Sequence, residues 1–72
     1  MTTSKKNLPP IARNIRKYRN EQSISQDKLS KLTDLSFATI TKIEAGDTPN
    51  PTVETMKKIA DALEVTIDDL IQ

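Results

Sequence analysis

The stretch SQDKLSKLTDLSFATITKIEAG, residues 25–46, decides the fold of this 72-residue chain. It begins with Ser25, a residue type that caps helices, and two turns of helical pattern follow from Gln26 to Thr33. After a short polar turn, Ser36 has the position of a second N-cap, and the pattern stops at Gly46, which suits a helix C-terminus. The stretch therefore predicts two short helices joined by a tight turn.

The second of these helices has two distinct faces. Ile40 and Ile43 have the spacing of an inward face. Together with the short turn, this arrangement is the outline of a helix-turn-helix, whose second helix leaves its other face free to enter a major groove. That free face carries five candidate base contacts: Ser36, Phe37, Ala38, Thr41 and Lys42. Lysine donates to guanine O6 or N7, a hydroxyl donates or accepts, and Phe or Ala can contact a thymine methyl group.

Helix signals also occur on both sides of this stretch. Pro9 and Pro10 mark a helix start, because proline has no N–H to lose in a first turn, and this helix should run to about Glu21. After the proline-containing loop that follows Gly46, Thr52 caps a fourth helix.

The last helix begins at the sequence TIDD. Thr66 is its N-cap and Asp69 occupies the N3 position of a capping box. No segment alternates apolar and polar residues as a strand does. The sequence therefore predicts an all-α domain of five helices over residues 8–72, preceded by a flexible arm at residues 1–7. Lys5 and Lys6 in this arm either contact phosphates or have no role.

Apolar residues at helical spacing are assigned to the core, with no role in function. In the first helix they are Ile11, Ile15 and Tyr18. In the two central helices they are Leu29, Leu32, Ile40 and Ile43. In the fourth helix they are Val53, Met56, Ile59, Ala60 and Leu63. Leu70 and Ile71 form the apolar face of the last helix.

Composition narrows the possible functions. The chain has neither cysteine nor histidine, so disulfides, thiolate metal ligands and the usual general base are absent. It also lacks a phosphate loop and any pairing of nucleophile and base, so we expect no enzymatic activity, no cofactor and no metal. No apolar run reaches the roughly 20 residues of a membrane span, and no signal peptide is present, which predicts a cytoplasmic protein.

The net charge of +1 hides an uneven distribution. Residues 1–42 hold nine basic and three acidic side chains, whereas residues 43–72 hold two basic and seven acidic ones. The basic part includes the two central helices. This asymmetry indicates a polyanion-binding front and a solvated or partner-facing back, although charged residues that merely coat exposed helices would also produce it.

Taken together, these segments resemble the phage-repressor-like, or Xre-type, helix-turn-helix family over roughly residues 11–71. IRKYR at 15–19 is similar to the end of the family's first helix, and SQDKLS at 25–30 to its second. SFATITKIEAG at 36–46 looks like its recognition helix and glycine stop, and residues 51–71 like its last two helices. The resemblance implies a lambda-repressor-like fold and a sequence-specific regulator, a repressor, that binds double-stranded DNA in a prokaryotic or phage context on the nucleoid.

The resemblance also assigns roles to single residues. Gln26 matches a glutamine that hydrogen-bonds a phosphate and braces the recognition helix, with simple capping support as the alternative. Arg19 and Glu44 match a salt bridge between the first helix and the end of the recognition helix, which leaves Arg19 near a phosphate. The full set of expected phosphate contacts is Ser25, Gln26, Arg19, Thr39, Thr48 and Asn50.

Three residues depart from the family pattern. Phe37 stands where a polar or basic residue is usual, and it either contacts DNA or packs over Leu35 and the turn. Asp34 stands where glycine is common, so it should adopt the left-handed conformation. Ser30 replaces a frequent alanine, and its hydroxyl should bond back to a carbonyl of its own helix.

Two kinds of partner follow. A regulator of this kind would bind a palindromic operator as a homodimer, formed either in solution or only on DNA. The expected interface is the C-terminus with Leu70 and Ile71, the loop before the fourth helix and the acidic back of that helix. The alternative function is an antitoxin or adaptor of the same fold, whose main role is to bind a protein partner.

Overall fold

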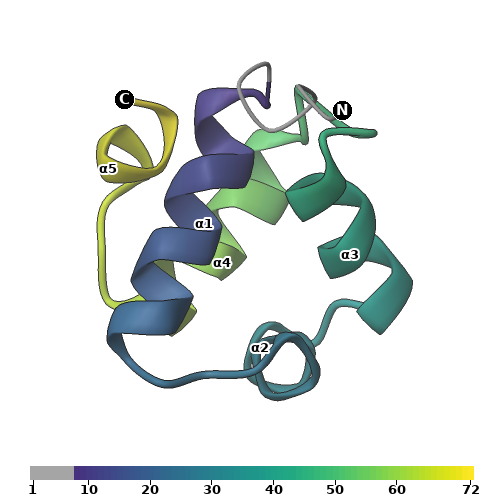
Figure 1. Cartoon of the computed structure of the whole chain (residues 1–72), viewed down its shortest axis with the longest axis vertical. Helices are drawn as coiled ribbons and strands as arrows, with labels where there is room; N and C mark the ends of the chain where they lie inside the picture. The colour runs from purple at the N-terminus through teal and green to yellow at the C-terminus, as the bar shows by residue number, and fades with distance from the viewer. Residues whose placement is uncertain (1–7) are drawn as a thin grey trace, which may run out of the picture.

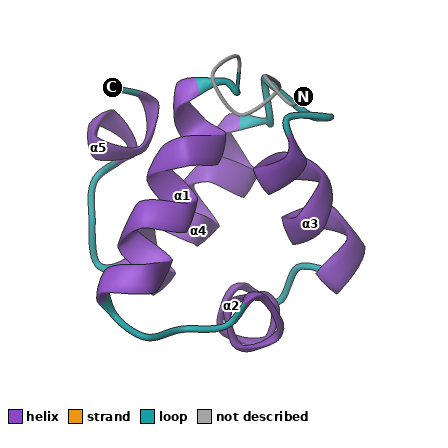
Figure 2. Cartoon of the chain, in the orientation of Figure 1, coloured by secondary structure: helices purple, strands orange, loops and turns teal. Residues whose placement is uncertain are grey.

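Helices make up the regular structure of the described part of the chain. The computed structural model describes residues 8–72, and Figure 2 shows that helices and loops, without strands, form this range. The helices are α1 (Pro10–Glu21), α2 (Gln26–Thr33), α3 (Phe37–Ala45), α4 (Val53–Leu63) and α5 (Ile67–Ile71). The predicted all-α class and the order of the helices are confirmed. The expected flexible arm at residues 1–7, with Lys5 and Lys6, lies outside the described residues.

The helix α1 is the centre of the arrangement. It packs against α3, α4 and α5, while α2 packs against α3 and α4 (Figure 1). Each helix contributes to one apolar core, whose buried members are Ile11, Ile15, Leu29, Ile40, Ile43, Ile59, Ala60, Leu63 and Leu70. In the described range, no helix is both long and apolar enough to cross a bilayer.

The helix N-termini follow their sequence signals. The side chains of Ser25, Ser36, Thr52 and Thr66 each accept a hydrogen bond from the backbone N–H three residues further on. Thr66 and Asp69 form the predicted capping box, since the Asp69 carboxylate accepts the Thr66 backbone N–H at 3.0 Å. This hydrogen bond is the main reason why the pKa of Asp69 lies below its usual range.

Two of the turns between helices behave as expected. Asp34 has φ +62°, so the predicted left-handed residue after α2 is confirmed. Gly46 follows α3 with φ +86°. A Cβ atom on Gly46 would lie 3.0 Å from Leu8 Cδ2 and 3.2 Å from Pro9 Cδ, so the start of α1 packs directly on this turn. Glycine is required here both by the conformation and by the space.

Two further left-handed residues, Ser23 and Glu64, have no signal in the sequence. Each follows a helix, and the next residue donates its N–H back across the turn: Ile24 to Arg19 O and Val65 to Ala60 O, both at 2.9 Å. This is the Schellman pattern, in which an apolar residue after the turn packs on the helix it has just left. Both apolar residues pack against the core, and this packing offsets the strain of a non-glycine residue.

The core prediction was wrong for Leu32, which is 49% exposed. The buried line of α2 is instead Leu29, Ser30 and Thr33. Both hydroxyls bond to carbonyls of their own helix, Ser30 to Asp27 O at 2.7 Å and Thr33 to Leu29 O at 2.8 Å. Because these small side chains satisfy their hydroxyl groups locally, they can face α2's neighbours, and Leu32 is turned outward. The predicted back-bond of Ser30 is confirmed.

Smaller corrections concern three other helices. Val53 at the start of α4 is exposed, and Tyr18 and Met56 are only partly buried against the core. In α5, Leu70 is fully buried and Ile71 is about half exposed, so the two residues do not share one surface.

Two side-chain amides attach α1 to the ends of other helices. Asn14 Nδ2 donates to Leu70 O and Gln22 Nε2 donates to Leu63 O, both at 2.7 Å. The last carbonyls of a helix have no partner inside the helix. These two bonds therefore satisfy exposed ends of α4 and α5 and fix them relative to α1.

Candidate nucleic-acid interface

The inner face of α3 carries a buried carboxylate. Glu44 is 1% exposed and lies beside the apolar Ile40 and Ile43. Arg19 of α1 meets it with two parallel bonds, from Nε to Oε2 at 2.8 Å and from Nη2 to Oε1 at 2.9 Å. This two-pronged geometry is the strong form of an arginine–carboxylate pair. The predicted Arg19–Glu44 salt bridge is confirmed.

Two more side chains complete the surroundings of Glu44. Gln26 Nε2, at the start of α2, donates to Glu44 Oε1 at 3.1 Å. Arg16 Nη2 donates to the Glu44 backbone oxygen at 3.3 Å, and Arg16 Nε lies 3.7 Å from Oε1. We call Arg16, Arg19, Gln26 and Glu44 the Glu44 network. It joins α1, α2 and α3 at one point.

The sequence reasoning missed Arg16 as a member of this network and gave Gln26 no bond to Glu44. A signal for Arg16 exists, because it precedes Arg19 by three residues and so lies on the same side of α1. Within residues 8–72, no buried side-chain polar atom lacks a hydrogen-bond partner. The carboxylate is therefore fully satisfied, which a buried charge requires.

The outward face of α3 is exposed where the sequence predicted it. Phe37 is 50% exposed, and Ala38 and Lys42 are exposed as well. Lys42 takes part in none of the salt bridges found in the described range. Leu35 packs against the core, whereas Phe37 keeps half of its surface in solvent. The first turn of α3 therefore presents an aromatic ring with a small residue beside it.

The hydroxyl groups on α3 already have partners. Ser36 Oγ accepts the Thr39 backbone N–H at 3.0 Å and lies 2.8 Å from Thr39 Oγ1. Thr41 Oγ1 donates to Ala38 O at 3.0 Å. A base contact from Ser36 or Thr41 would use the remaining hydrogen-bonding capacity of a hydroxyl that is held in place.

The predicted phosphate contacts lie in two regions at opposite ends of α3. Ser25 and Gln26 are at the N-terminus of α2, where Ser25 Oγ accepts the Lys28 N–H at 3.0 Å. Thr48 and the exposed Asn50 lie in the loop between α3 and α4.

Arg19 differs from these groups. Only 13% of its side chain is exposed, and besides Glu44 it donates to Ile24 O at 2.9 Å. Its geometry is that of a brace behind the interface. The residues from 8 to 72 contain no cluster of acidic, cysteine or histidine side chains able to hold a metal ion.

Comparison with known proteins defines the class. The family described as "Helix-turn-helix" matches residues 15–70. The chain therefore belongs to this helix-turn-helix family, and the resemblance to its Xre-type, phage-repressor-like members is confirmed together with the lambda-repressor-like fold.

Two relatives come from Bacillus subtilis strain 168. The chain is 31% identical over 64 residues to the uncharacterized HTH-type transcriptional regulator RghRB, covering 89% of this chain and 46% of the relative. It is 37% identical over 60 residues to the HTH-type transcriptional regulator SlrR, covering 83% of this chain and 40% of the relative. The chain thus spans less than half the length of either relative.

Proposed function

We propose that this chain is a sequence-specific DNA-binding domain of a transcriptional regulator and that the outward face of α3 enters the major groove. The observation that carries the proposal is the contrast between the two faces of α3. Its inner face is held by Glu44 and its outer face presents Phe37, Ala38 and Lys42 to solvent. Membership of the helix-turn-helix family and the names of the two relatives support this function.

The Glu44 network explains how such a helix keeps its orientation. Base discrimination requires donors placed within a few tenths of an ångström, because each good base contact contributes about 1–3 kcal/mol of selectivity. Glu44 connects α3 to both α1 and α2. Gln26 uses one amide N–H on Glu44, so its second N–H is available to a phosphate at the helix N-terminus. Phosphate contacts there and at Asn50 would set the register of α3 on the duplex.

The proposal includes a palindromic operator bound by two copies, which act as a repressor in the cytoplasm of a prokaryotic cell. One module of this size contacts few base pairs, and pairs of half-sites one helical turn apart supply the missing specificity. Ile71 is about half exposed beside a pocket of about 170 Å³ that Pro10, Ile11, Pro49 and Asn50 also line. This surface is the proposed dimer contact. Leu70 is excluded from it because it is buried in the core.

Selection of bound duplexes from a random DNA pool tests the function. At about 0.15 M salt, nonspecific phosphate binding is weakened, so enrichment reports base contacts. We expect one palindromic site to be enriched by the wild type and lost in Lys42→Ala. The matched control is Lys57→Ala on the exposed surface of α4, which should enrich the same site. If the wild type enriches nothing, the proposal fails and an antitoxin or adaptor role, with a protein partner, takes its place.

A further inference from the structure

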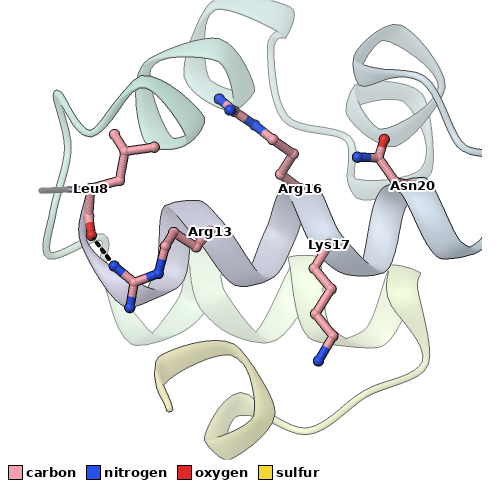
Figure 3. A pocket seen from close by; sticks show the side chains of 5 residues that line it. All are labelled: Leu8, Arg13, Arg16, Lys17 and Asn20. Atoms are coloured by element: carbon pink, nitrogen blue, oxygen red, sulfur yellow. Dashed lines mark hydrogen bonds between the residues drawn. The ribbon is translucent and has the colours of Figure 1, made fainter. Parts of the chain in front are cut away.

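The exposed face of α1 carries a basic pocket that the proposed base and phosphate contacts do not use. Leu8, Arg13, Arg16, Lys17 and Asn20 line an open hollow of about 300 Å³ (Figure 3). The four α1 residues follow each other at spacings of three, four and seven along one side of the helix. Three are cationic, one is an amide, and none is acidic. We call these five residues the α1 pocket.

The cations of the α1 pocket keep free donors. Arg13 uses Nη1 on Leu8 O at 2.6 Å, which leaves most of its guanidinium N–H groups unused. Lys17 Nζ lies 5.3 Å from the centre of the Tyr18 ring and joins no salt bridge among residues 8–72. The charge of Lys17 acts on Asp69 of α5, but that carboxylate already accepts two hydrogen bonds from or within its capping box partner Thr66. The pocket is therefore positively charged without a neutralising partner in its wall.

The α1 pocket also adjoins the proposed DNA-binding surface. Arg16 reaches from the pocket to the Glu44 carbonyl at the end of α3. Figure 3 shows Arg16 and Asn20 extending from one edge of α1 and Lys17 from the other, so the pocket spreads across the exposed side of this helix. In Figure 1, α1 and the connection that leads to the start of α2 lie on the near side of the molecule, with α4 behind. The pocket is thus continuous with the N-terminus of α2, where Ser25 and Gln26 are expected to meet a phosphate.

The dimensions suit a nucleic-acid backbone. Arg13 and Asn20 are seven residues apart, which corresponds to about 10 Å along a helix. Successive nucleotides of one strand advance about 3.4 Å along the duplex axis, so about three of them pass such a length. Arginine, lysine and asparagine are common phosphate donors. An acidic peptide offers the same charge, but nothing connects it to the adjacent phosphate-binding N-terminus of α2.

We propose that the α1 pocket binds the phosphodiester backbone of the same duplex that α3 contacts, beyond the phosphates held at the start of α2. This inference rests on the proposed DNA-binding function and extends its footprint by two to three phosphates on one flank. Arg13 and Lys17 are the direct ligands. Arg16 has a double role, because it contacts both this flank and the Glu44 network.

The test is the salt dependence of binding to a random-sequence duplex of about 30 base pairs, measured by fluorescence anisotropy. Phosphate contacts do not depend on sequence, and each one lost lowers the slope of log K against log salt concentration by about 0.9. The double variant Arg13→Gln/Lys17→Gln should lower the slope by about 2 and weaken binding about 30-fold at about 0.15 M salt. Asn20→Asp should weaken binding as well, because it places a negative charge in the pocket.

The matched control is Lys57→Gln/Lys58→Gln, which removes the same charge from the exposed surface of α4. This control should keep the wild-type slope, and thermal melting shows that all variants are folded. Equal losses of slope in both double variants would mean that only net charge matters and would overturn the pocket assignment. An unchanged slope in the α1 variant, with a Lys42-dependent operator still selected, would overturn the pocket alone. A wild type that binds no duplex would overturn the proposed function and the pocket together.

Discussion

Oppositely charged side chains meet in two very different regions of this molecule. In the Glu44 network, Arg19 and Glu44 pair at 2.8 Å with 13% and 1% of their side chains exposed. On the surfaces of α2 and α4, Lys31–Asp27 and Lys57–Asp61 pair at 3.2 and 3.3 Å, with about two thirds or more of each side chain in solvent. The distances are similar and the burial is not. The difference shows why only the first kind of pair can fix the position of a helix.

The energetic reason is solvation. A surface pair exchanges water for a partner and contributes about 0–1 kcal/mol. A buried carboxylate has already lost its water, so removing its charge or its partner leaves an uncompensated group that costs about 3–5 kcal/mol. A domain of this size buries only about 60% of its unfolded surface and has little stability to spare. The Glu44 network is therefore the most sensitive point of the fold.

The largest expected effect is that of Glu44→Gln. The variant keeps the shape of the side chain and removes the charge that Arg16 and Arg19 face, so we expect the free energy of unfolding to fall by about 3 kcal/mol. Urea unfolding followed by circular dichroism measures the change. A loss below about 1 kcal/mol would place this buried pair in the same class as the surface pairs.

A smaller effect separates the two arginines of the network. Arg19→Gln removes two bonds to the carboxylate and one to Ile24 O, whereas Arg16→Gln removes one bond to the Glu44 backbone from a side chain that is 40% exposed. We expect losses of about 2–3 kcal/mol for Arg19 and about 1 kcal/mol for Arg16. Equal losses in urea unfolding would show that burial does not grade the contribution of each arginine.

Acid should reveal the contribution of an exposed carboxylate that is held by hydrogen bonds. The pKa of Asp69 is lowered in the folded chain, mainly by the Thr66 backbone N–H. The ionised form is therefore favoured by folding, so its contribution is present above the unfolded pKa of about 4 and is lost as the pH falls through the lower folded value. Melting temperatures of the wild type and Asp69→Asn should approach each other below about pH 4. A constant difference between them down to acid pH would contradict this origin.

The smallest expected effect is that of Asp61→Asn on α4. It removes the exposed i, i+4 pair with Lys57, so the free energy of unfolding should change by about 0.5 kcal/mol or less. The same urea experiment serves, repeated at about 1 M salt, where the difference from the wild type should disappear. A loss as large as that of Arg16→Gln would remove the distinction between the two regions.

Local signals predicted the helices well because each one depends on near neighbours. The N-caps Ser25, Ser36, Thr52 and Thr66 bond within three residues, and the capping box does the same. Asp34 was identified as left-handed because only a tight turn fits between α2 and α3. Features of this kind are contained in short stretches of sequence.

The misses concern packing between distant segments. Leu32 was assigned to the core from its spacing alone, but the direction of α2 is set by α3 and α4. The left-handed Ser23 and Glu64 depend on where Ile24 and Val65 pack, which no local signal shows. In the candidate interface, the Arg19–Glu44 pair came from the family resemblance, and the bonds of Arg16 and Gln26 to Glu44 appeared only in three dimensions.

The central claim is that α3 is held on its inner face so that its outer face can contact DNA. Amide chemical shifts of the 15N-labelled chain, titrated with the duplex selected from the random pool, test this claim most directly. The largest changes should lie at residues 25–26, 36–42 and 48–50, with α4 and α5 unaffected except at a dimer contact near Ile71. Changes centred on Leu32 and the adjacent surface of α4, with α3 unperturbed, would contradict it.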